Sequence, residues 1–316
     1  MEAASPTSQS IVDQSRVTES ARALLSGLID YAGLFPPAAL SMQAAVENYD
    51  AYLRGPHRWM LGRFIVPATR LEEFGKTLFA LPTAVTSSGM DWRLSVLLGS
   101  DAAADLAHTY WFDDEKAHLG KRRRVVIESV EVKAASVGEI ARLATTIPAQ
   151  FETYFEISPV NARESIVAIA ESGRRAKIRT GGETSEKFPT PETLFDFIEL
   201  CSKLNVPFKA TAGLHHPIRS LHRLTYQPDS PSEIMHGFLN VFLAAAFVRA
   251  GMEKRLAVEL VKEQAAAFHF ESDAVEWRGH RLSLGDLTDS RQRFSVSFGS
   301  CSFTEPIDDL RALHLL

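Results

Sequence analysis

Short apolar runs typical of β-strands alternate with amphipathic helical stretches along almost the whole chain, and this alternation is what most restricts the fold. Most of the runs end at glycine or proline, as strands followed by a turn commonly do. Strands separated by helices are typical of parallel α/β folds, because each helix returns the chain to the start of the next parallel strand. The runs lie at residues 27–33, 62–67, 92–99, 124–134, 151–158, 176–182, 207–213 and 293–299.

Helices are predicted between these runs. Residues 137–147 begin with Ser136 and Glu139 in the spacing of a capping box, and residues 190–204 begin directly after Pro189. Eight strands with helices between them predict an α/β fold of the (β/α)8 type, a TIM barrel. The length of 316 residues is sufficient, because such barrels need about 250 residues and tolerate insertions.

The regular spacing of the strands ends after the seventh. A long insertion, residues 214–291, separates the seventh run from the eighth and contains helical stretches at 238–251 and 253–268 and a hairpin pattern at 274–282. The insertion follows the carboxyl end of a strand, where barrel active sites are built, so a lid or a specificity element is one interpretation. An oligomer contact or simple padding fits the sequence equally well.

The composition is that of a globular protein without a strongly charged surface. The net charge is −5, with acidic and basic residues mixed throughout, so we expect no nucleic-acid or membrane partner. The two cysteines fit a reducing cytoplasm. The first 20 residues are polar, which predicts a disordered tail before a single barrel domain over 21–316. We expect a small-molecule substrate, and the sequence leaves homo-oligomer formation open.

Two lysines stand on predicted strands, where a solvated lysine has no obvious place. Period-2 alternation puts Arg179 on the same face as Lys177, and Thr211 on the same face as Lys209. Polar side chains alternate in the same way on the fourth, fifth and eighth strands, so we expect an ionic barrel lumen. These polar residues are Ser129, Glu131, Lys133, Glu152, Tyr154, Glu156, Ser295 and Ser297.

An ionic lumen with paired lysines suggests amine chemistry. Charges at close range, such as Glu131 and Glu156 beside the lysines, shift one another's pKa by whole units. A lysine beside a second cation loses its proton more readily, and the neutral amine attacks carbonyl carbons to form a Schiff base. A neighbouring carboxylate can move protons during carbinolamine formation and C–C cleavage. We expect neither a metal nor a cofactor.

Other interpretations stay open. The lysines also fit a structural ion pair with Glu131 or Glu156, or the electrostatic binding of an anionic substrate. A metal-dependent hydrolase or lyase would use His215, His216 and His236, although adjacent histidines usually point in different directions and no His-Glu-x-x-His spacing occurs. A barrel that binds a metabolite without catalysis is a further alternative.

The strand ends resemble those of a known family. Lys177-x-x-Thr180-Gly181 and Lys209-Ala210-Thr211-Ala212-Gly213 are similar to the two lysine strands of class I deoxyribose-phosphate aldolases. Ile29-Asp30-Tyr31 is similar to that family's opening Ile-Asp-His. Landmarks in matching order are Val66-Pro67 with Thr69 at the second strand, Glu131 at the position of the proton-relaying aspartate, and Phe298-Gly299-Ser300-Cys301-Ser302 at the phosphate-binding end.

This resemblance implies membership of the class I aldolase superfamily, with Lys177 forming the Schiff base, Lys209 lowering its pKa and Glu131 relaying protons. Several positions depart from the family pattern. Glu131 replaces an aspartate, His215 and His216 stand in place of a short Gly-Ile-Arg turn, and the insertion has no counterpart in compact members. A deoxyribose-phosphate substrate therefore does not follow. The expected function is a Schiff-base lyase for a small carbonyl compound, with anionic and phosphorylated compounds among the candidates.

An anion site is also predicted at residues 299–302. Backbone N–H groups there precede a predicted helix over 305–313, capped by Thr304, and a helix N-terminus attracts negative charge. The expected catalytic residues are Lys177, Lys209 and Glu131. The expected substrate-binding residues are Asp30, Glu156, Arg179, Thr180, Gly181, Gly182, Thr211, Gly213, His215, His216, Gly299, Ser300 and Ser302.

Overall fold

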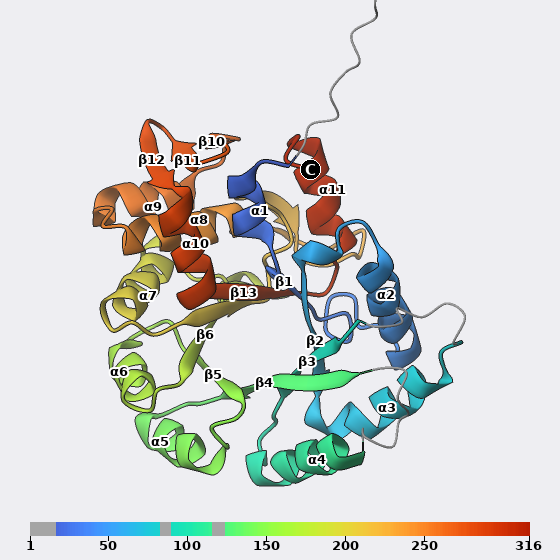
Figure 1. The fold of residues 1–316 in the computed structure, drawn as a ribbon. Helices are drawn as coiled ribbons and strands as arrows, with labels where there is room; N and C mark the ends of the chain where they lie inside the picture. Colours follow the sequence, from blue (N-terminus) through green and yellow to red (C-terminus); the bar gives the residue numbers. More distant parts are fainter. Residues whose placement is uncertain (1–16, 83–89, 116–123) are drawn as a thin grey trace, which may run out of the picture.

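A closed barrel of parallel strands forms the centre of the molecule (Figure 1). The computed structural model describes residues 17–82, 90–115 and 124–316. The strands follow the order β1-β13-β7-β6-β5-β4-β3-β2 around the ring, which confirms the predicted (β/α)8 fold. They are β1 Ile29–Tyr31, β2 Leu61–Pro67, β3 Trp92–Leu97, β4 Val125–Lys133, β5 Glu152–Ile157, β6 Arg175–Arg179, β7 Phe208–Thr211 and β13 Ser295–Ser300.

Helices surround the barrel and connect its strands (Figure 1). Two of them confirm the predicted helix starts: Ser136 accepts the amide of Glu139 at α5, and Thr190 accepts the amide of Thr193 at α7. The helices are α1 Glu19–Leu25, α2 Met42–Arg54, α3 Leu71–Ala80, α4 Ala102–Glu115, α5 Val137–Thr146, α6 Arg163–Glu171, α7 Pro191–Lys203, α8 Phe238–Arg249, α9 Lys254–Lys262, α10 Leu284–Arg293 and α11 Thr304–Ala312.

Helix α1 begins within the predicted tail of residues 1–20. Residues 1–16 lie outside the described part of the chain. Helix α1 starts at Glu19, where the Thr18 hydroxyl accepts the amide of Ala21. Ser20 is buried and donates to the carbonyl of Glu271 at 2.5 Å. Serine and threonine are common both in tails and at helix starts, so composition alone placed this boundary too late.

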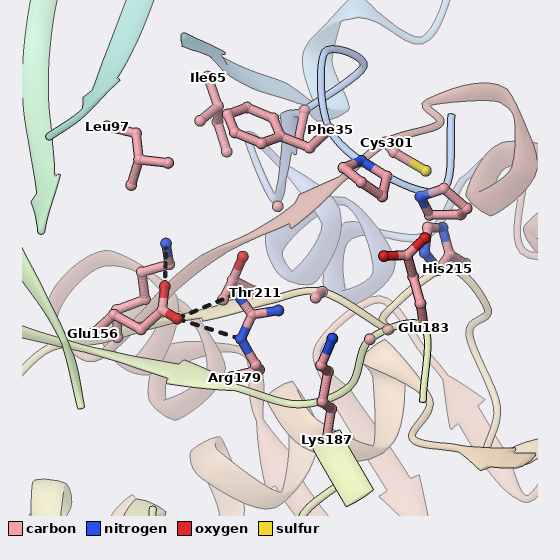
Figure 2. Close-up of a pocket in the computed structure, with 18 of the residues that line it drawn as sticks. Phe35, Ile65, Leu97, Glu156, Arg179, Glu183, Lys187, Thr211, His215 and Cys301 are labelled. Atoms are coloured by element: carbon pink, nitrogen blue, oxygen red, sulfur yellow. Dashed lines mark hydrogen bonds and ion pairs between the residues drawn. The ribbon is translucent and has the colours of Figure 1, made fainter. Parts of the chain in front are cut away.

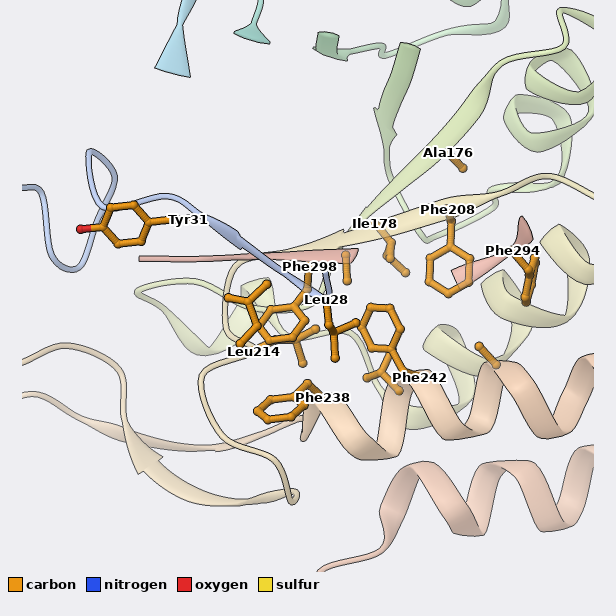
Figure 3. Close-up of a cluster of buried hydrophobic side chains, with 14 of the residues drawn as sticks. Leu28, Tyr31, Ala176, Ile178, Phe208, Leu214, Phe238, Phe242, Phe294 and Phe298 are labelled. Atoms are coloured by element: carbon orange, nitrogen blue, oxygen red, sulfur yellow. The ribbon is translucent and has the colours of Figure 1, made fainter. Parts of the chain in front are cut away.

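The first helix of the insertion belongs to the barrel. Helix α8 packs its phenylalanines on β7 and β13, with ring centroids 5.1 Å apart for Phe238 and Phe298 and 6.5 Å apart for Phe242 and Phe208 (Figure 3). Residues 238–247 are all buried, as the apolar run predicted. Helix α8 thus takes the place of the helix between the seventh and eighth barrel strands.

None of the helices in the described ranges has the length and the apolar character that a membrane span requires.

The rest of the insertion adds two small sheets. Strands β8 Ser220–Arg223 and β9 Ser232–Met235 form a hairpin that the sequence did not predict. Strands β10 Phe268–Phe270, β11 Ala274–Trp277 and β12 His280–Ser283 form a three-stranded sheet that contains the predicted hairpin. The helix predicted over 253–268 was too long. Helix α9 ends at Lys262, because the Glu263 carboxylate accepts the next two amides and turns the chain towards β10.

Candidate functional site

A cavity of about 280 Å³ lies at the carboxyl ends of the barrel strands, the end where barrel active sites are found. One side is polar and the other is apolar, and Figure 2 shows Phe35, Ile65 and Leu97 across the cavity from Glu156 and Arg179. The charged and polar side chains are Glu131, Lys133, Glu156, Lys177, Arg179, Glu183, Lys187, Thr211 and His215. The apolar ones include Phe35, Pro36, Pro37, Ile65, Leu97, Leu224 and Met235.

Below this cavity, two carboxylates hold Lys209 inside the barrel. Its Nζ lies 2.6 Å from Oδ2 of Asp30 and 2.6 Å from Oε1 of Glu131. Lys209 is 0% exposed, and both carboxylates are 1% exposed. Of these three residues, only Glu131 lines the cavity.

The same carboxylate of Glu131 continues towards the cavity. Its Oε2 lies 2.7 Å from Nζ of Lys177, which in turn lies 2.8 Å from Oε2 of Glu156. Arg179 donates from Nη2 to Oε1 of Glu156 at 3.2 Å. We call this alternating series the charge chain: Asp30, Lys209, Glu131, Lys177, Glu156 and Arg179.

Strand register brings these residues together. Lys177 on β6 is paired with Glu156 on β5 and with Lys209 on β7. Neighbouring residues of parallel strands point to the same side of the sheet, so all three side chains point into the lumen. Lys177 is 4% exposed and lines the cavity, whereas Lys209 does not. Of the two lysines, Lys177 is thus the one that a ligand can reach.

The buried charges stabilise one another in their ionised forms. Burial alone would raise the pKa of Glu131, but Lys177 and Lys209 outweigh it and hold that pKa well below its ordinary value. Burial alone would lower the pKa of Lys209, but Asp30 and Glu131 outweigh it and raise that pKa. Lys209 is therefore a permanent cation at neutral pH, next to a permanently ionised Glu131.

Hydroxyl and amide donors complete the coordination of the two inner carboxylates. Asp30 accepts the backbone amide of Arg63 at 2.7 Å and the hydroxyl of Ser297 at 2.8 Å. Glu131 accepts the hydroxyl of Ser95 at 2.6 Å. These bonds fix the carboxylates in place and further favour their charged forms.

A second ionic layer closes the barrel beneath the charge chain. The Arg63 guanidinium lies 2.9 Å from Glu128 and 2.9 Å from Glu152, and Arg175 lies 2.7 Å from Glu152. The sequence interpretation did not include Arg63 or Ser95. The period-2 alternation that identified the lysine strands also applies to the runs at 62–67 and 92–99, and it would have placed both residues in the lumen.

Close backbone contact explains the glycines at the ends of β6 and β7. A Cβ on Gly213 would lie 2.8 Å from the Cα of Gly181. Gly213 also has a φ of +72°, a backbone angle that residues with a side chain rarely adopt. The Thr180 hydroxyl donates to the carbonyl of Ala212 at 2.7 Å and joins the two strand ends. Thr180 and Gly181 are therefore part of the scaffold beside the cavity.

The groups expected to bind an anion at residues 299–302 have hydrogen-bond partners within the protein. Helix α11 begins at Thr304, and the hydroxyl of Ser302, rather than that of Thr304, accepts the amide of Glu305 at 3.1 Å. Ser300 is buried and lies 3.4 Å from Nδ1 of His215. The carboxylate of Glu305 already supplies negative charge in the first turn of the helix.

The predicted histidines do not converge on one point. His215 lies 3.3 Å from Glu305 and His216 lies 2.6 Å from Asp309, whereas the buried His236 contacts the carbonyl of Pro189 at 2.8 Å. His215 borders both the main cavity and a second one of about 300 Å³ under the β8–β9 hairpin. In the ranges 17–82, 90–115 and 124–316, no cluster of three or more His, Cys, Asp or Glu side chains is arranged to hold a metal ion.

The predicted site residues therefore fall into two groups. The first group lines the main cavity, and the second lies below or beside it. The lining group is Glu131, Glu156, Lys177, Arg179, Gly182, Thr211, Gly213, His215 and Gly299. The other group is Asp30, Thr180, Gly181, Lys209, His216, Ser300 and Ser302. The apolar side of the cavity, with Ile65, Leu97, Leu224 and Met235, was not predicted, because apolar residues at strand ends look like ordinary core residues in the sequence.

Comparison of the sequence with protein-family models and with curated proteins gives no match. The resemblance to deoxyribose-phosphate aldolases thus rests on short motifs and on their order along the chain. The cavity and the charge chain are the features of the structure that bear on function.

Proposed function

We propose that this protein is a class I, Schiff-base lyase of the aldolase type that acts on a small carbonyl compound, with Lys177 as the nucleophile. The position of Lys177 carries the proposal: its amine lies at the cavity wall between two carboxylates, above a second lysine that is fully buried. A strand lysine at the carboxyl end of a barrel is well placed to attack a bound carbonyl carbon.

The neighbouring carboxylates give the proton transfers a path. The ammonium of Lys177 passes a proton to Glu156, 2.8 Å away, because Lys209 keeps Glu131 ionised, and the neutral amine adds to the carbonyl carbon. The resulting carbinolamine loses its hydroxyl as water when the proton is returned, which leaves a protonated imine. A base removes the proton of the substrate hydroxyl two carbons away, the C–C bond breaks to release an aldehyde, and the bonding electrons move to the imine as an enamine. Protonation of the enamine carbon and addition of water then free the second product and the amine.

Electrostatics favour the central intermediate of this sequence. The protonated imine carries its positive charge on the nitrogen that carried it as an ammonium, so Glu131 and Glu156 stabilise both forms. Lys209 keeps Glu131 ionised throughout and links it to Asp30. We assign Lys209 a positioning and electrostatic role.

Borohydride trapping tests the proposal. The protein is incubated with aldehydes, ketones and 2-oxo acids, reduced, and digested for peptide mass spectrometry. The expected result is a stable adduct on Lys177 that is absent from Lys177→Met. The matched control is Lys187→Met, because Lys187 also lines the cavity but lies outside the charge chain. An adduct that survives in Lys177→Met, or no adduct with any carbonyl compound, overturns the proposal.

A barrel that binds a metabolite without catalysis is the second candidate. The ion pairs on both sides of Lys177 favour it, because such pairs also occur in purely structural networks. This candidate predicts saturable binding of a small anion with no reducible adduct on Lys177, which the same trapping assay would detect.

A further inference from the structure

We infer that the carbonyl compound is a 2-oxo acid with an apolar substituent, whose carboxylate binds Arg179 while its carbonyl carbon meets Lys177. This inference rests on the proposed function and names the substrate class for that site. For C–C cleavage the substrate is a 4-hydroxy-2-oxo acid: the imine forms at C2, the C3–C4 bond breaks, and C4 leaves as an aldehyde with the hydroxyl proton lost to a base.

The position of Arg179 supports an anion beside the nucleophile. Arg179 stands two residues after Lys177 on β6, so both side chains point into the lumen. Its Nε and Nη2 contact Oε1 of Glu156 at 3.3 and 3.2 Å. The remaining nitrogen of the guanidinium points away from Glu156, into the space between Thr211 and Lys187 (Figure 2). The side chain is 36% exposed, so this part can receive a carboxylate.

The distance between the two cations decides which anion fits. Lys177 and Arg179 contact the two oxygens of one carboxylate, that of Glu156. A group held by Arg179 is therefore only a few ångströms from a carbonyl carbon attached to Lys177. A carboxylate bonded directly to the carbonyl carbon meets this requirement. A phosphate at the far end of a sugar chain would have to bind elsewhere.

The alternative anion position is less favourable. At the N-terminus of α11, Ser302 already accepts the amide of Glu305, and the Glu305 carboxylate lies in the first turn. An incoming anion would meet that negative charge. The main cavity, by contrast, is lined by four cationic side chains (Lys133, Lys177, Arg179 and Lys187) and three carboxylates (Glu131, Glu156 and Glu183), and two of these carboxylates are already paired with Lys177. The cations of the cavity therefore direct an anion to the β6 side.

The opposite wall specifies the rest of the substrate. Phe35, Ile65 and Leu97 face the charged side (Figure 2), and Leu224 and Met235 extend this apolar surface from the β8–β9 hairpin. Their side chains offer no hydroxyl, amide or charge to a ligand. A polyhydroxylated chain buried there would lose hydrogen bonds to water without replacement, whereas an alkyl or aryl group would gain by burial. The volume of about 280 Å³ limits this group to a small one.

Three carbonyl compounds test the inference. For each compound, we measure the concentration at which borohydride trapping on Lys177 is half-maximal. The compounds are 2-oxoisovalerate, 3-methyl-2-butanone, which has the same carbon branch but no carboxylate, and dihydroxyacetone phosphate. We expect 2-oxoisovalerate to react at a concentration at least about tenfold below the other two, since it makes a charge-assisted contact that the ketone lacks. Arg179→Gln should abolish this preference. Arg175→Gln, on the same strand at the closed end of the barrel, should keep it.

A ligand that cannot form an imine separates this inference from the proposed function. Binding of 2-hydroxyisovalerate is measured by NMR titration on the wild-type protein and on Arg179→Gln. If this compound binds through Arg179 but no carbonyl compound is trapped, the lyase proposal fails and the carboxylate site stands. If carbonyl compounds are trapped but the ketone or the phosphate ester reacts at equal or lower concentration, the substrate class is wrong and the lyase proposal stands. If no carbonyl compound is trapped and 2-hydroxyisovalerate does not bind through Arg179, the lyase proposal and the substrate class are both wrong.

Discussion

Lys177 and Lys209 are paired in register on β6 and β7 and share one carboxylate, with Oε2 of Glu131 2.7 Å from Lys177 and Oε1 2.6 Å from Lys209. Glu131 thereby separates the two positive charges. The lysines differ in depth, because only Lys177 borders the cavity. Substitution of Lys209 should therefore affect stability first, and substitution of Lys177 should affect reactivity first.

Replacement of Lys209 by Met should strongly destabilise the protein. It would leave Asp30 and Glu131 buried without their shared counter-charge, and removing one partner of a buried ion pair typically costs about 3–5 kcal/mol. Urea denaturation at pH 7 measures the change. The control is Lys203→Met, which breaks an exposed pair with Glu199 and should cost no more than about 0.5 kcal/mol. A loss for Lys209→Met as small as that of the control would show that the inner carboxylates do not depend on Lys209.

Period-2 alternation predicted the lumen face of the barrel from the sequence. It placed Glu131, Glu156, Lys177 and Lys209 on lumen faces, and the parallel register keeps them there. Alternation does not give depth along the barrel axis, which depends on how the strands are staggered. For this reason the sequence could not distinguish the buried Lys209 from the accessible Lys177, nor place Asp30 below the cavity.

Contacts made only in three dimensions account for most of the remaining differences. The close approach of Gly181 to Gly213 joins residues far apart in the chain, so no local pattern indicates it. The β8–β9 hairpin was missed because its strands are short and mostly exposed or half-exposed, without a clear apolar face. Leu224 and Met235, which this hairpin brings to the cavity, were missed with it.

The free energy of unfolding should fall more steeply with decreasing pH in the wild-type protein than in a variant that lacks the Glu131 carboxylate. The pKa values of Asp30 and Glu131 are lowered in the folded protein, mainly because nearby cations outweigh burial. Such groups stabilise the fold above the pKa of the unfolded chain, about 3.9 for Asp and 4.3 for Glu, and this stabilisation is lost as the pH falls below those values. Denaturation from pH 7 to pH 3 should show a shallower acid slope for Glu131→Gln. Equal acid slopes for the wild-type protein and Glu131→Gln would contradict a lowered pKa of Glu131 in the folded protein.

Replacement of Gly213 by Ala should destabilise the ends of β6 and β7. The new Cβ would lie 2.8 Å from the Cα of Gly181, and the φ of +72° would be strained. Overpacking of this kind typically costs about 1–3 kcal/mol, to which the strained conformation adds about 1–2 kcal/mol. Gly138→Ala in α5 is the control, since its Cβ would meet nothing within 4 Å, and a stabilisation of up to about 1 kcal/mol is expected. Thermal and urea unfolding of both variants give the comparison.

Cys301 should report on occupancy of the cavity without any assumption about catalysis. It lines the cavity at 5% exposure, whereas Cys201 on α7 is 0% exposed, and the chain has no other cysteine. Burial raises the pKa of the Cys301 thiol, so labelling by a disulfide reagent should be slow at pH 7.5 and accelerate about tenfold per pH unit. A ligand in the cavity should slow it further. In Cys201→Ala, the labelling rate reports on Cys301 alone. Labelling of Cys201 before Cys301 would contradict the position of Cys301 in the cavity wall. So would an unchanged labelling rate in the presence of a compound that binds.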